Sequence, residues 1–251
     1  MNEETARLRG LYLDLMERTI LGMIYNDAPM VHFEGRYIHD IRLEGKDWPS
    51  QAHSMIGFKR MRSLRLMCEE VLRRDIPGDF IETGVWRGGA CIMMRAVLKA
   101  YNVTNRRIFV CDSFEGLPAP NAVDYPVDAG DILSSYDALK VSQETVEANF
   151  NQYGLLDEQV HFVKGWFKDT LHSLPSHQYA IVRLDGDMYE STIQALDALY
   201  GFLSPSGFLI VDDYGVTPMC STAVHDFRTK HAISEEIRPI DWTGSYWQKA
   251  P

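Results

Sequence analysis

The stretch Phe80-Ile81-Glu82-Thr83-Gly84-Val85-Trp86-Arg87-Gly88-Gly89 runs from an apolar strand through a glycine-rich turn into a helix. Glycine lets the backbone approach a ligand closely, and the N-terminus of a helix offers unpaired N–H groups to that ligand. The spacing G-x-x-x-G-G differs from the G-x-G-x-x-G of dinucleotide-binding folds, which counts against NAD. Close packing of the helix against the strand is the structural alternative for these glycines.

Asp112 ends the apolar strand that follows this turn. A carboxylate at this place can accept hydrogen bonds from both ribose hydroxyls of an adenosine. The glycine turn and the acid together therefore favour a nucleoside-containing cofactor.

Short apolar runs alternate with helical patterns from Gly78 onward. This alternation is typical of an α/β fold in which helices cover a parallel sheet. The predicted strands are residues 80–83, 107–112, 160–164, 179–185 and 208–212, and the predicted helices are residues 89–100, 142–153, 191–202 and 221–231. Two further short strands, residues 235–241 and 245–248, predict an antiparallel pair that closes a mostly parallel sheet of seven strands.

The N-terminal part has a different pattern, and we divide the chain into residues 1–75 and residues 76–251. Helical spacing of apolar residues predicts one helix within residues 1–24 and a second over residues 56–73. Residues 26–57 between them are irregular and carry aromatic side chains, which is consistent with a lid over a binding site or with packing on the main domain. Residues 121–136 also lack a clear period and predict a long loop over the edge of the sheet.

Composition and charge exclude several classes of protein. The chain has 251 residues, of which 45% are hydrophobic and 24% charged, so it is neither disordered nor fibrous. Its 35 acidic residues outnumber 25 basic ones, which argues against a nucleic-acid partner. No apolar run approaches the ~20 residues that span a bilayer. Glu3 and Glu4 stand where a signal peptide would be basic, so we expect a cytoplasmic protein without a membrane partner, and four widely spaced cysteines in the reduced state.

Acidic residues follow two strongly apolar runs. Asp185 and Asp187 come after one predicted strand, and Asp212 and Asp213 come after another. Because ligands bind at the carboxyl ends of strands in an open α/β sheet, we expect these carboxylates to meet there. Crowded carboxylates repel one another unless a cation compensates, and hard oxygen ligands favour Mg²⁺, Mn²⁺ or Ca²⁺ over Zn²⁺. Helix capping explains one or two of these acids but hardly all four.

Other interpretations of the same residues stay open at this point. Asp185-Gly186-Asp187 has the D-x-D pattern of aspartate-nucleophile phosphatases and of metal-binding glycosyltransferases. In the phosphatases this pattern opens the core, whereas here a glycine turn of the nucleoside-binding type precedes it. A non-catalytic nucleoside-binding domain is a third reading. His225 and His53 are further candidates for a catalytic base, and Ser54 lacks the sequence around it that marks a nucleophile elbow.

Five motifs in one order resemble the macrocin O-methyltransferase family, which includes mycinamicin III and novobiocin-pathway sugar O-methyltransferases. They span residues 82–90, 111–116, 165–170, 185–187 and 212–214. The resemblance extends from the first helix to Trp247. It implies a Rossmann-like class I methyltransferase fold with helices on both faces of the sheet, a lid formed by N-terminal segments, and a homo-oligomer.

The resemblance also implies a cofactor, a metal and their residues. S-adenosylmethionine would be the methyl donor, and Mg²⁺ would be bound by Asp185, Asp212 and Asp213, with Asp187 matching the general base. Glu82 and Asp112 would hold the donor, and close contacts to it would come from residues in the turn and after the next strand: Thr83, Gly84, Gly88 and Ser113. Trp166 would pack near the adenine edge of the donor, with a purely structural role as the alternative. The acceptor implied is a small molecule, a glycosylated natural product. Because Mg²⁺ can orient a second hydroxyl beside the one that reacts, we expect this acceptor to carry a vicinal diol. The sequence departs from the family pattern in residues 119–136 and in the N-terminal segment, which leaves the acceptor open.

Overall fold

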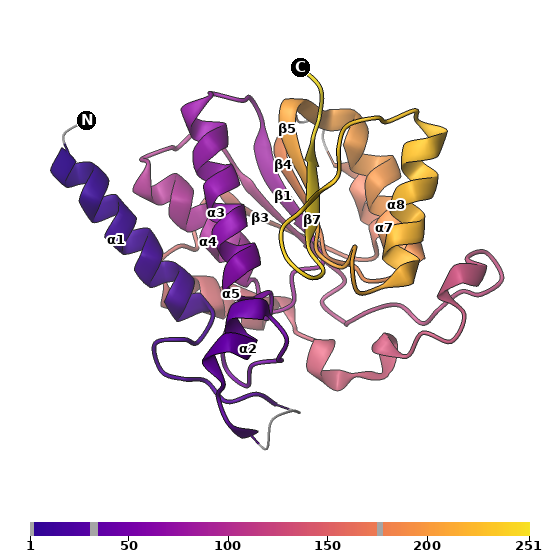
Figure 1. The fold of residues 1–251 in the computed structure, drawn as a ribbon, viewed down its shortest axis with the longest axis horizontal. Coiled ribbons are helices and arrows are strands. Elements are labelled where there is room, and N and C mark those ends of the chain that lie inside the picture. Colours follow the sequence, from indigo (N-terminus) through magenta and orange to yellow (C-terminus); the bar gives the residue numbers. More distant parts are fainter. Residues whose placement is uncertain (1–2, 31–34, 175–177) are drawn as a thin grey trace.

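A mostly parallel sheet of seven strands forms the middle layer of the computed structural model, which describes residues 3–30, 35–174 and 178–251 (Figure 1). The strands are β1 (Asp79–Thr83), β2 (Ile108–Asp112), β3 (Val160–Lys164), β4 (Tyr179–Leu184), β5 (Leu203–Val211), β6 (Arg238–Pro239) and β7 (Ser245–Gln248). Their order in the sheet is β3-β2-β1-β4-β5-β7-β6. Strand β7 runs antiparallel to both of its neighbours, and the other described pairs are parallel. The α/β class and the seven-stranded sheet predicted from the sequence are confirmed.

Alternation of side chains along each strand divides the core between the two faces of the sheet. Phe80 of β1 belongs to one buried cluster and its neighbour Ile81 to the other. Glu82 continues on the Phe80 side, and its partner in the β1–β4 register is Arg183. Arg183 in turn faces Ile210 of β5. This register therefore brings an acidic and a basic side chain together on one face of the sheet.

Helices cover both faces, as Figure 1 shows. The Phe80 face is covered by α1 (Glu3–Ile20), α3 (Gly57–Arg73), α4 (Gly89–Ala100) and α5 (Gln143–Gln152). The other face is covered by α6 (Phe167–Thr170), α7 (Tyr189–Leu199) and α8 (Pro218–Lys230). Shorter helical turns are α2 (His39–Glu44), η2 (Pro126–Asp128), η3 (Leu133–Ser135), η4 (Asp137–Leu139), η5 (Leu171–Ser173) and η6 (Tyr200–Phe202).

The N-terminal helices share the core of the sheet. Leu13 of α1 and Met61 of α3 are fully buried in the same cluster as Ile92 of α4 and Phe80 of β1. The predicted division after residue 75 thus falls where β1 is about to begin, and packing continues across it. As a boundary between domains it stays a prediction.

Two buried charged residues order the irregular part of the N-terminal segment. Arg42 donates to the Asp47 carboxylate at 2.7 Å and to the carbonyl oxygens of Leu21 and Asp27. The carboxylate of Asp27 accepts hydrogen bonds from residues 50–52. These bonds replace the regular backbone ladder that the segment lacks. Residues 31–34 of the predicted lid, residues 26–57, lie outside the described residues.

The loop after β2 crosses the same end of the molecule, below the sheet in Figure 1. We call residues 119–136 the edge loop. Asp128, which is 0% exposed, accepts hydrogen bonds from the backbone N–H groups of Tyr189 and Glu190 and so caps the N-terminus of α7. Tyr136 makes an edge-to-face contact with Trp48, with ring centroids 5.8 Å apart. The lid segment and the edge loop therefore meet. Among the described helices, none is long and apolar enough to cross a lipid bilayer.

Candidate active site

The predicted site residues converge at the carboxyl ends of the central strands. The chain crosses from β1 to β2 on one side of the sheet and from β3 back to β4 on the other, so β1 and β4 flank the switch point at which open α/β sheets bind ligands. A cavity of about 780 Å³ opens there. Its volume lies in the range of cofactor and small-molecule sites. Gly84, Asp112, Asp185 and Asp212 all line it.

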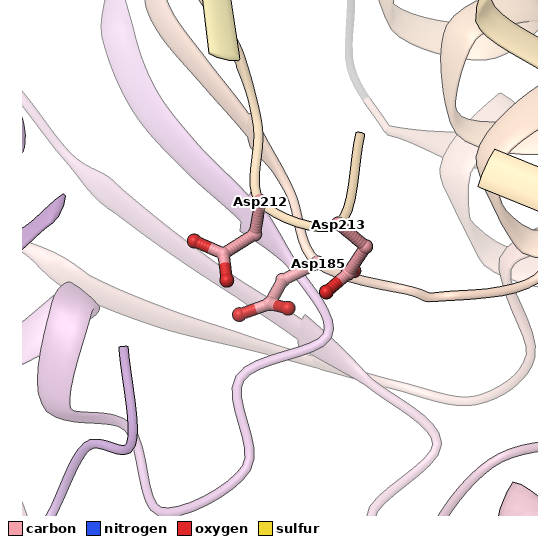
Figure 2. Close-up of side chains that lie close together, drawn as sticks. All are labelled: Asp185, Asp212 and Asp213. Atoms are coloured by element: carbon pink, nitrogen blue, oxygen red, sulfur yellow. The ribbon is translucent and has the colours of Figure 1, made fainter. Parts of the chain in front are cut away.

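Three carboxylates form what we call the acid cluster: Asp185, Asp212 and Asp213. One oxygen from each lies within 4.8 Å of the others. Figure 2 shows the three side chains side by side beyond β4 and β5. Backbone bonds extend the sheet ladder to this point, because Asp185 N–H donates to the Thr83 carbonyl and Asp212 N–H to the Leu184 carbonyl, both at 2.9 Å. The residues predicted as metal ligands are thus brought together by the sheet.

Asp187 lies beside the acid cluster and lines the same cavity. Its backbone is left-handed, with φ of 56°, and its N–H donates to Asp213 Oδ2 at 3.1 Å. Burial and then repulsion from Asp185 and Asp212 raise the pKa of its carboxyl to about 8. The same causes, burial first and then the neighbouring carboxylates, raise the pKa values of Asp185 and Asp213. The cluster thus favours uptake of positive charge, as protons or as a cation.

Two arginines that the sequence analysis missed already supply part of that charge. Arg183 is 1% exposed, donates to Asp185 Oδ2 at 2.7 Å, and also pairs with Glu82 and Asp212. Arg60, from α3, pairs with Asp212 and donates to Asp241 Oδ2 at 3.1 Å. Burial alone would lower the pKa of Arg183, but the surrounding carboxylates hold it well above its ordinary value. One signal in the sequence marked Arg183: it is the lone charge within a buried strand.

The glycine-turn end of the cavity contains four of the residues predicted to contact a cofactor: Gly84, Asp112, Ser113 and Trp166. The carboxylate of Asp112 accepts hydrogen bonds from Val85 N–H at 2.7 Å and Phe114 N–H at 2.8 Å. Burial raises the pKa of Asp112, and these backbone N–H groups oppose the rise. The two bonds fix the carboxylate at the end of β2, beside the cavity.

The other three predicted cofactor contacts do not line the cavity. Glu82 is 1% exposed, pairs with Arg183, and accepts a hydrogen bond from the Cys91 thiol at 2.8 Å. Burial raises the pKa of Glu82 to about 7, against the effect of Arg183. Thr83 holds Asp185 through its carbonyl, and Gly88 has the positive φ of 84° that the turn into α4 needs. Direct cofactor contacts by Glu82, Thr83 and Gly88 stay predictions.

The alternative bases lie elsewhere. His225 is exposed on α8, where its Nε2 is 3.0 Å from the Tyr214 hydroxyl. His53 is half-buried, with Nδ1 2.8 Å from the Tyr153 hydroxyl, and burial lowers its pKa. Neither histidine lines the cavity, nor does Ser54. Instead, the His53 carbonyl accepts the Gly89 N–H at the start of α4.

Apolar and aromatic side chains from three separate segments also line the cavity. The lid segment contributes Trp48 and Met55, the edge loop contributes Leu133, and the β6–β7 turn contributes Trp242. Trp242 donates its Nε1–H to the Glu44 carbonyl at 2.6 Å, which ties this turn to the lid segment. The site thus combines a polar floor with apolar walls.

A sheet in this order, with a ligand cavity at the switch point beside a glycine turn, defines a class I methyltransferase fold. The family model for macrocin-O-methyltransferase (TylF) matches residues 16–249, and the chain belongs to this family.

Two curated relatives and one solved structure are similar to almost the whole chain. The 8-demethyl-8-(2,3-dimethoxy-α-L-rhamnosyl)-tetracenomycin-C 4'-O-methyltransferase of Streptomyces olivaceus is 50% identical, with 97% of this chain and 94% of that protein covered. The mycinamicin III 3''-O-methyltransferase of Micromonospora griseorubida is 47% identical, with 96% of each chain covered. The structure of the O-methyltransferase NovP superposes with a TM-score of 0.92 at 45% identity, over 97% of this chain and 100% of that one.

Proposed function

We propose that the protein transfers a methyl group from S-adenosylmethionine to a sugar hydroxyl of a glycosylated natural product, with a divalent cation in the acid cluster. One observation carries the proposal: three carboxylates converge on the cavity that Gly84 and Asp112 also line. Two relatives in the family are named for methylating a rhamnosyl tetracenomycin and mycinamicin III, which supports this acceptor class. Family membership favours methyl transfer over a phosphatase, a glycosyltransferase or a non-catalytic nucleoside-binding domain.

The chemistry of the acid cluster fits Mg²⁺. Its donors are carboxylate oxygens alone, which hard divalent cations prefer, and three of them can reach a common point. Asp185, Asp212 and Asp213 would hold the ion. A bound Mg²⁺ supplies Lewis-acid chemistry, because it lowers the pKa of an adjacent hydroxyl group and orients a vicinal one.

In this proposal Asp187 is the group that receives the proton. The acceptor oxygen attacks the methyl carbon, so that a C–O bond forms as the C–S bond breaks and the sulfonium becomes a neutral thioether. The hydroxyl proton moves to the Asp187 carboxylate, which lines the same cavity as the acid cluster. The protein's further task is to hold oxygen, carbon and sulfur in line.

The walls of the cavity favour an acceptor that carries apolar rings. Trp48, Met55 and Trp242 line the same cavity as the acid cluster. Aromatic side chains of this kind bury large apolar area and exclude water. A sugar could therefore reach the acid cluster while the rest of the acceptor packs against these walls.

A methylation assay tests the proposal. We would incubate the protein with labelled S-adenosylmethionine and a panel of glycosylated natural products that lack a sugar O-methyl group, with Mg²⁺ or with EDTA. We expect label in the acceptor only with Mg²⁺. Undiminished turnover in EDTA, with metal content measured as nil, would refute the cation. Stoichiometric binding of the donor without methylated product across the panel would refute the activity.

A further inference from the structure

Arg60 contacts more groups than the two partners of a simple ion pair. It is buried and lies on α3, and its guanidinium reaches three separate segments of the chain. It pairs with Asp212 of the acid cluster, donates through Nε to Asp241 Oδ2 at 3.1 Å, and donates through Nη2 to the Gly45 carbonyl at 3.3 Å. It also lines the cavity.

The surroundings of Arg60 are shaped to let this side chain pass. A Cβ on Gly45 would lie 2.5 Å from Arg60 Nη2, and a Cβ on Gly244 would lie 2.7 Å from Arg60 Cδ. Both distances are shorter than real Cβ contacts, so a larger residue at either position would crowd the arginine, and at Gly45 it would also crowd the Ile56 carbonyl oxygen, 2.4 Å from the Cβ position. Two glycines from opposite ends of the chain therefore leave a slot that the arginine occupies.

Asp212 has both of its carboxylate oxygens occupied. Arg183 donates to Oδ1 and Arg60 to Oδ2. A cation bound by the acid cluster through one of these oxygens would bring a second positive charge close to the arginine on that oxygen, and the repulsion favours withdrawal of that arginine. Arg183 is fixed within β4 and also neutralises Glu82 and Asp185. Arg60 already contacts a second carboxylate, that of Asp241, whose side chain is 0% exposed.

We propose that Arg60 is a positioning residue that holds Asp212 in the absence of a cation and moves wholly to Asp241 when a cation binds. The inference rests on the cation of the proposed function. Arg60 and the cation compete for Asp212 Oδ2, and Asp241 lowers the cost of the exchange. The charged groups that face Arg60 are Asp212, Asp241, Asp185 and Arg183.

The exchange also acts on the wall of the cavity. Asp241 accepts the N–H groups of Thr243 and Gly244, and its neighbour Trp242 is bonded to Glu44 in the lid segment. An Arg60 that pairs with Asp241 alone would therefore strengthen the ion pair at the place where the β6–β7 turn contacts the lid segment. A cation in the acid cluster would thus stabilise the part of the cavity wall that Trp242 forms.

The test is a double-mutant cycle read out by calorimetric titration with Mn²⁺ in the presence of S-adenosylmethionine. Arg60→Met should lower the Kd for Mn²⁺ about tenfold, because the competitor is gone. Asp241→Asn keeps an oxygen for Thr243 and Gly244 but removes the carboxylate to which Arg60 retreats, so Kd should rise about tenfold. In the Arg60→Met background, Asp241→Asn should change Kd less than about twofold.

The cycle separates exchange from simple electrostatics and from loss of structure. If removal of charge acted only through space, Asp241→Asn would weaken binding equally in both backgrounds. If Arg60 were merely structural, Arg60→Met would weaken Mn²⁺ binding. Arg62→Met is the matched control, because Arg62 also lies on α3 but pairs with Asp14 and Glu17. It should leave Kd unchanged.

The outcomes distinguish this inference from the proposed function. Wild-type protein that binds Mn²⁺ with a Kd equal to that of Arg60→Met would overturn the inference alone. Failure of both proteins to bind Mn²⁺ would overturn the inference together with the cation of the proposed function. Binding by Arg60→Met alone would support the inference strongly. Donor affinity and thermal unfolding, measured for each variant, establish that the variants are folded.

Discussion

Asp187 combines an unusual backbone with an unusual environment. Its φ of 56° is one that Asp and Asn adopt more readily than other side chains, so Asp187→Asn removes the base without straining the chain. We expect the turnover number to fall by about 10² to 10⁴, because the proton acceptor is lost. The Kd for Mn²⁺ should stay within about threefold. Initial rates between about pH 6 and 9 provide the measurement, and unchanged rates over that interval would place the base elsewhere.

Asp212 is the member of the acid cluster whose removal should be most costly. It faces both arginines, and Asp212→Asn leaves them with one carboxylate fewer at the cluster. Turnover should fall by at least about 100-fold, because a cation contributes several kcal/mol to such reactions. Donor affinity should be nearly retained, since the Asp112 carboxylate is held by the N–H groups of Val85 and Phe114 and not by Asp212. Calorimetry with S-adenosylmethionine checks this, and equal losses of donor affinity and turnover would contradict the assignment.

Single residues were predictable where the strand pattern fixed their place. Asp185, Asp212 and Asp213 follow apolar runs directly, so their meeting at one edge could be inferred from the sequence. The roles of Glu82 and Arg60 could not. The pleat of β1 turns the Glu82 side chain toward β4, a strand that lies about 100 residues later in the chain. Arg60 is one of several arginines on α3, and nothing in the local sequence distinguishes it from the others.

The turn between β1 and α4 depends on how closely two strand ends approach. A Cβ at Gly84 would lie 1.8 Å from the Asp185 carbonyl oxygen, and φ at Gly84 is 82°. Gly84→Ala should therefore lower the free energy of unfolding by more than about 3 kcal/mol, since strain alone costs about 1–3 kcal/mol. It should also abolish donor binding. Urea denaturation and calorimetry are the measurements.

Gly154→Ala is the control for this substitution. Gly154 has a φ of 63° but no atom within 4 Å of its Cβ position, so the alanine adds backbone strain alone, roughly 1 kcal/mol. If Gly84→Ala cost no more than Gly154→Ala, the close approach to Asp185 would not constrain the site.

The edge loop is fixed to the site through the cap of α7. Asp128→Ala removes both hydrogen bonds to the helix, so the free energy of unfolding should fall by about 1–2 kcal/mol. Because Leu133 lines the cavity, the KM for the acceptor should rise several-fold while donor affinity is kept. Ser142→Ala, which removes the cap of α5, should cost a similar free energy without changing acceptor KM. Equal KM values for the two variants would show that the loop does not shape the acceptor site.

Elements with an uninterrupted pattern were predicted closely. The bounds of α4 and β3 agree with the prediction at both ends. Strand β5 begins at Leu203, whereas the prediction began at Phe208. Residues 204–207 lack the apolar pattern of a strand, and the register between β5 and β4 shifts at this point. Helix α2 was missed since it has only six residues, ends at Glu44, and is held by the tertiary contacts of Arg42 rather than by an amphipathic period.

Cation and pH should act together on the stability of the molecule. Without a cation, the pKa of Asp187 is about 8 and those of Asp185 and Asp213 are raised, against about 3.9 for aspartate in an unfolded chain. Between these values the folded state binds more protons than the unfolded one. This contribution to the free energy of unfolding therefore falls as pH rises from about 4 to 8.

A cation takes the place of those protons, so its stabilising effect should grow with pH. We expect the difference in Tm between Mg²⁺-loaded and EDTA-treated protein to be larger at about pH 8 than at about pH 5. Differential scanning calorimetry gives both values. Asp212→Asn should show almost no difference at either pH, and a constant difference in the wild type would contradict the role of these carboxylates.

The packing of whole elements against one another was the feature least predictable from the sequence. Packing of α1 and α3 into the core of the sheet could not be inferred, because the pattern of each helix shows that it has a buried face and not what covers it. A homo-oligomer and a cytoplasmic location stay predictions from the sequence. The cavity is lined by residues of the lid segment, the edge loop and the β6–β7 turn, which no local pattern relates to one another, so the proposed acceptor could not be derived from the sequence.

Strand β7 lies between β5 and β6 although it follows both in the chain. A nascent polypeptide that has emerged from the ribosome only as far as β6 therefore exposes the edge of β5. Leu209 and Ile210 at this edge then lack their β7 partners, Trp247 and Tyr246. Thr243, whose hydroxyl holds the Asp212 carbonyl, is also still inside the exit tunnel. During translation the molecule must complete most of its core before it acquires a finished active site, and binding by chaperones in that interval would be directed at the open edge of β5.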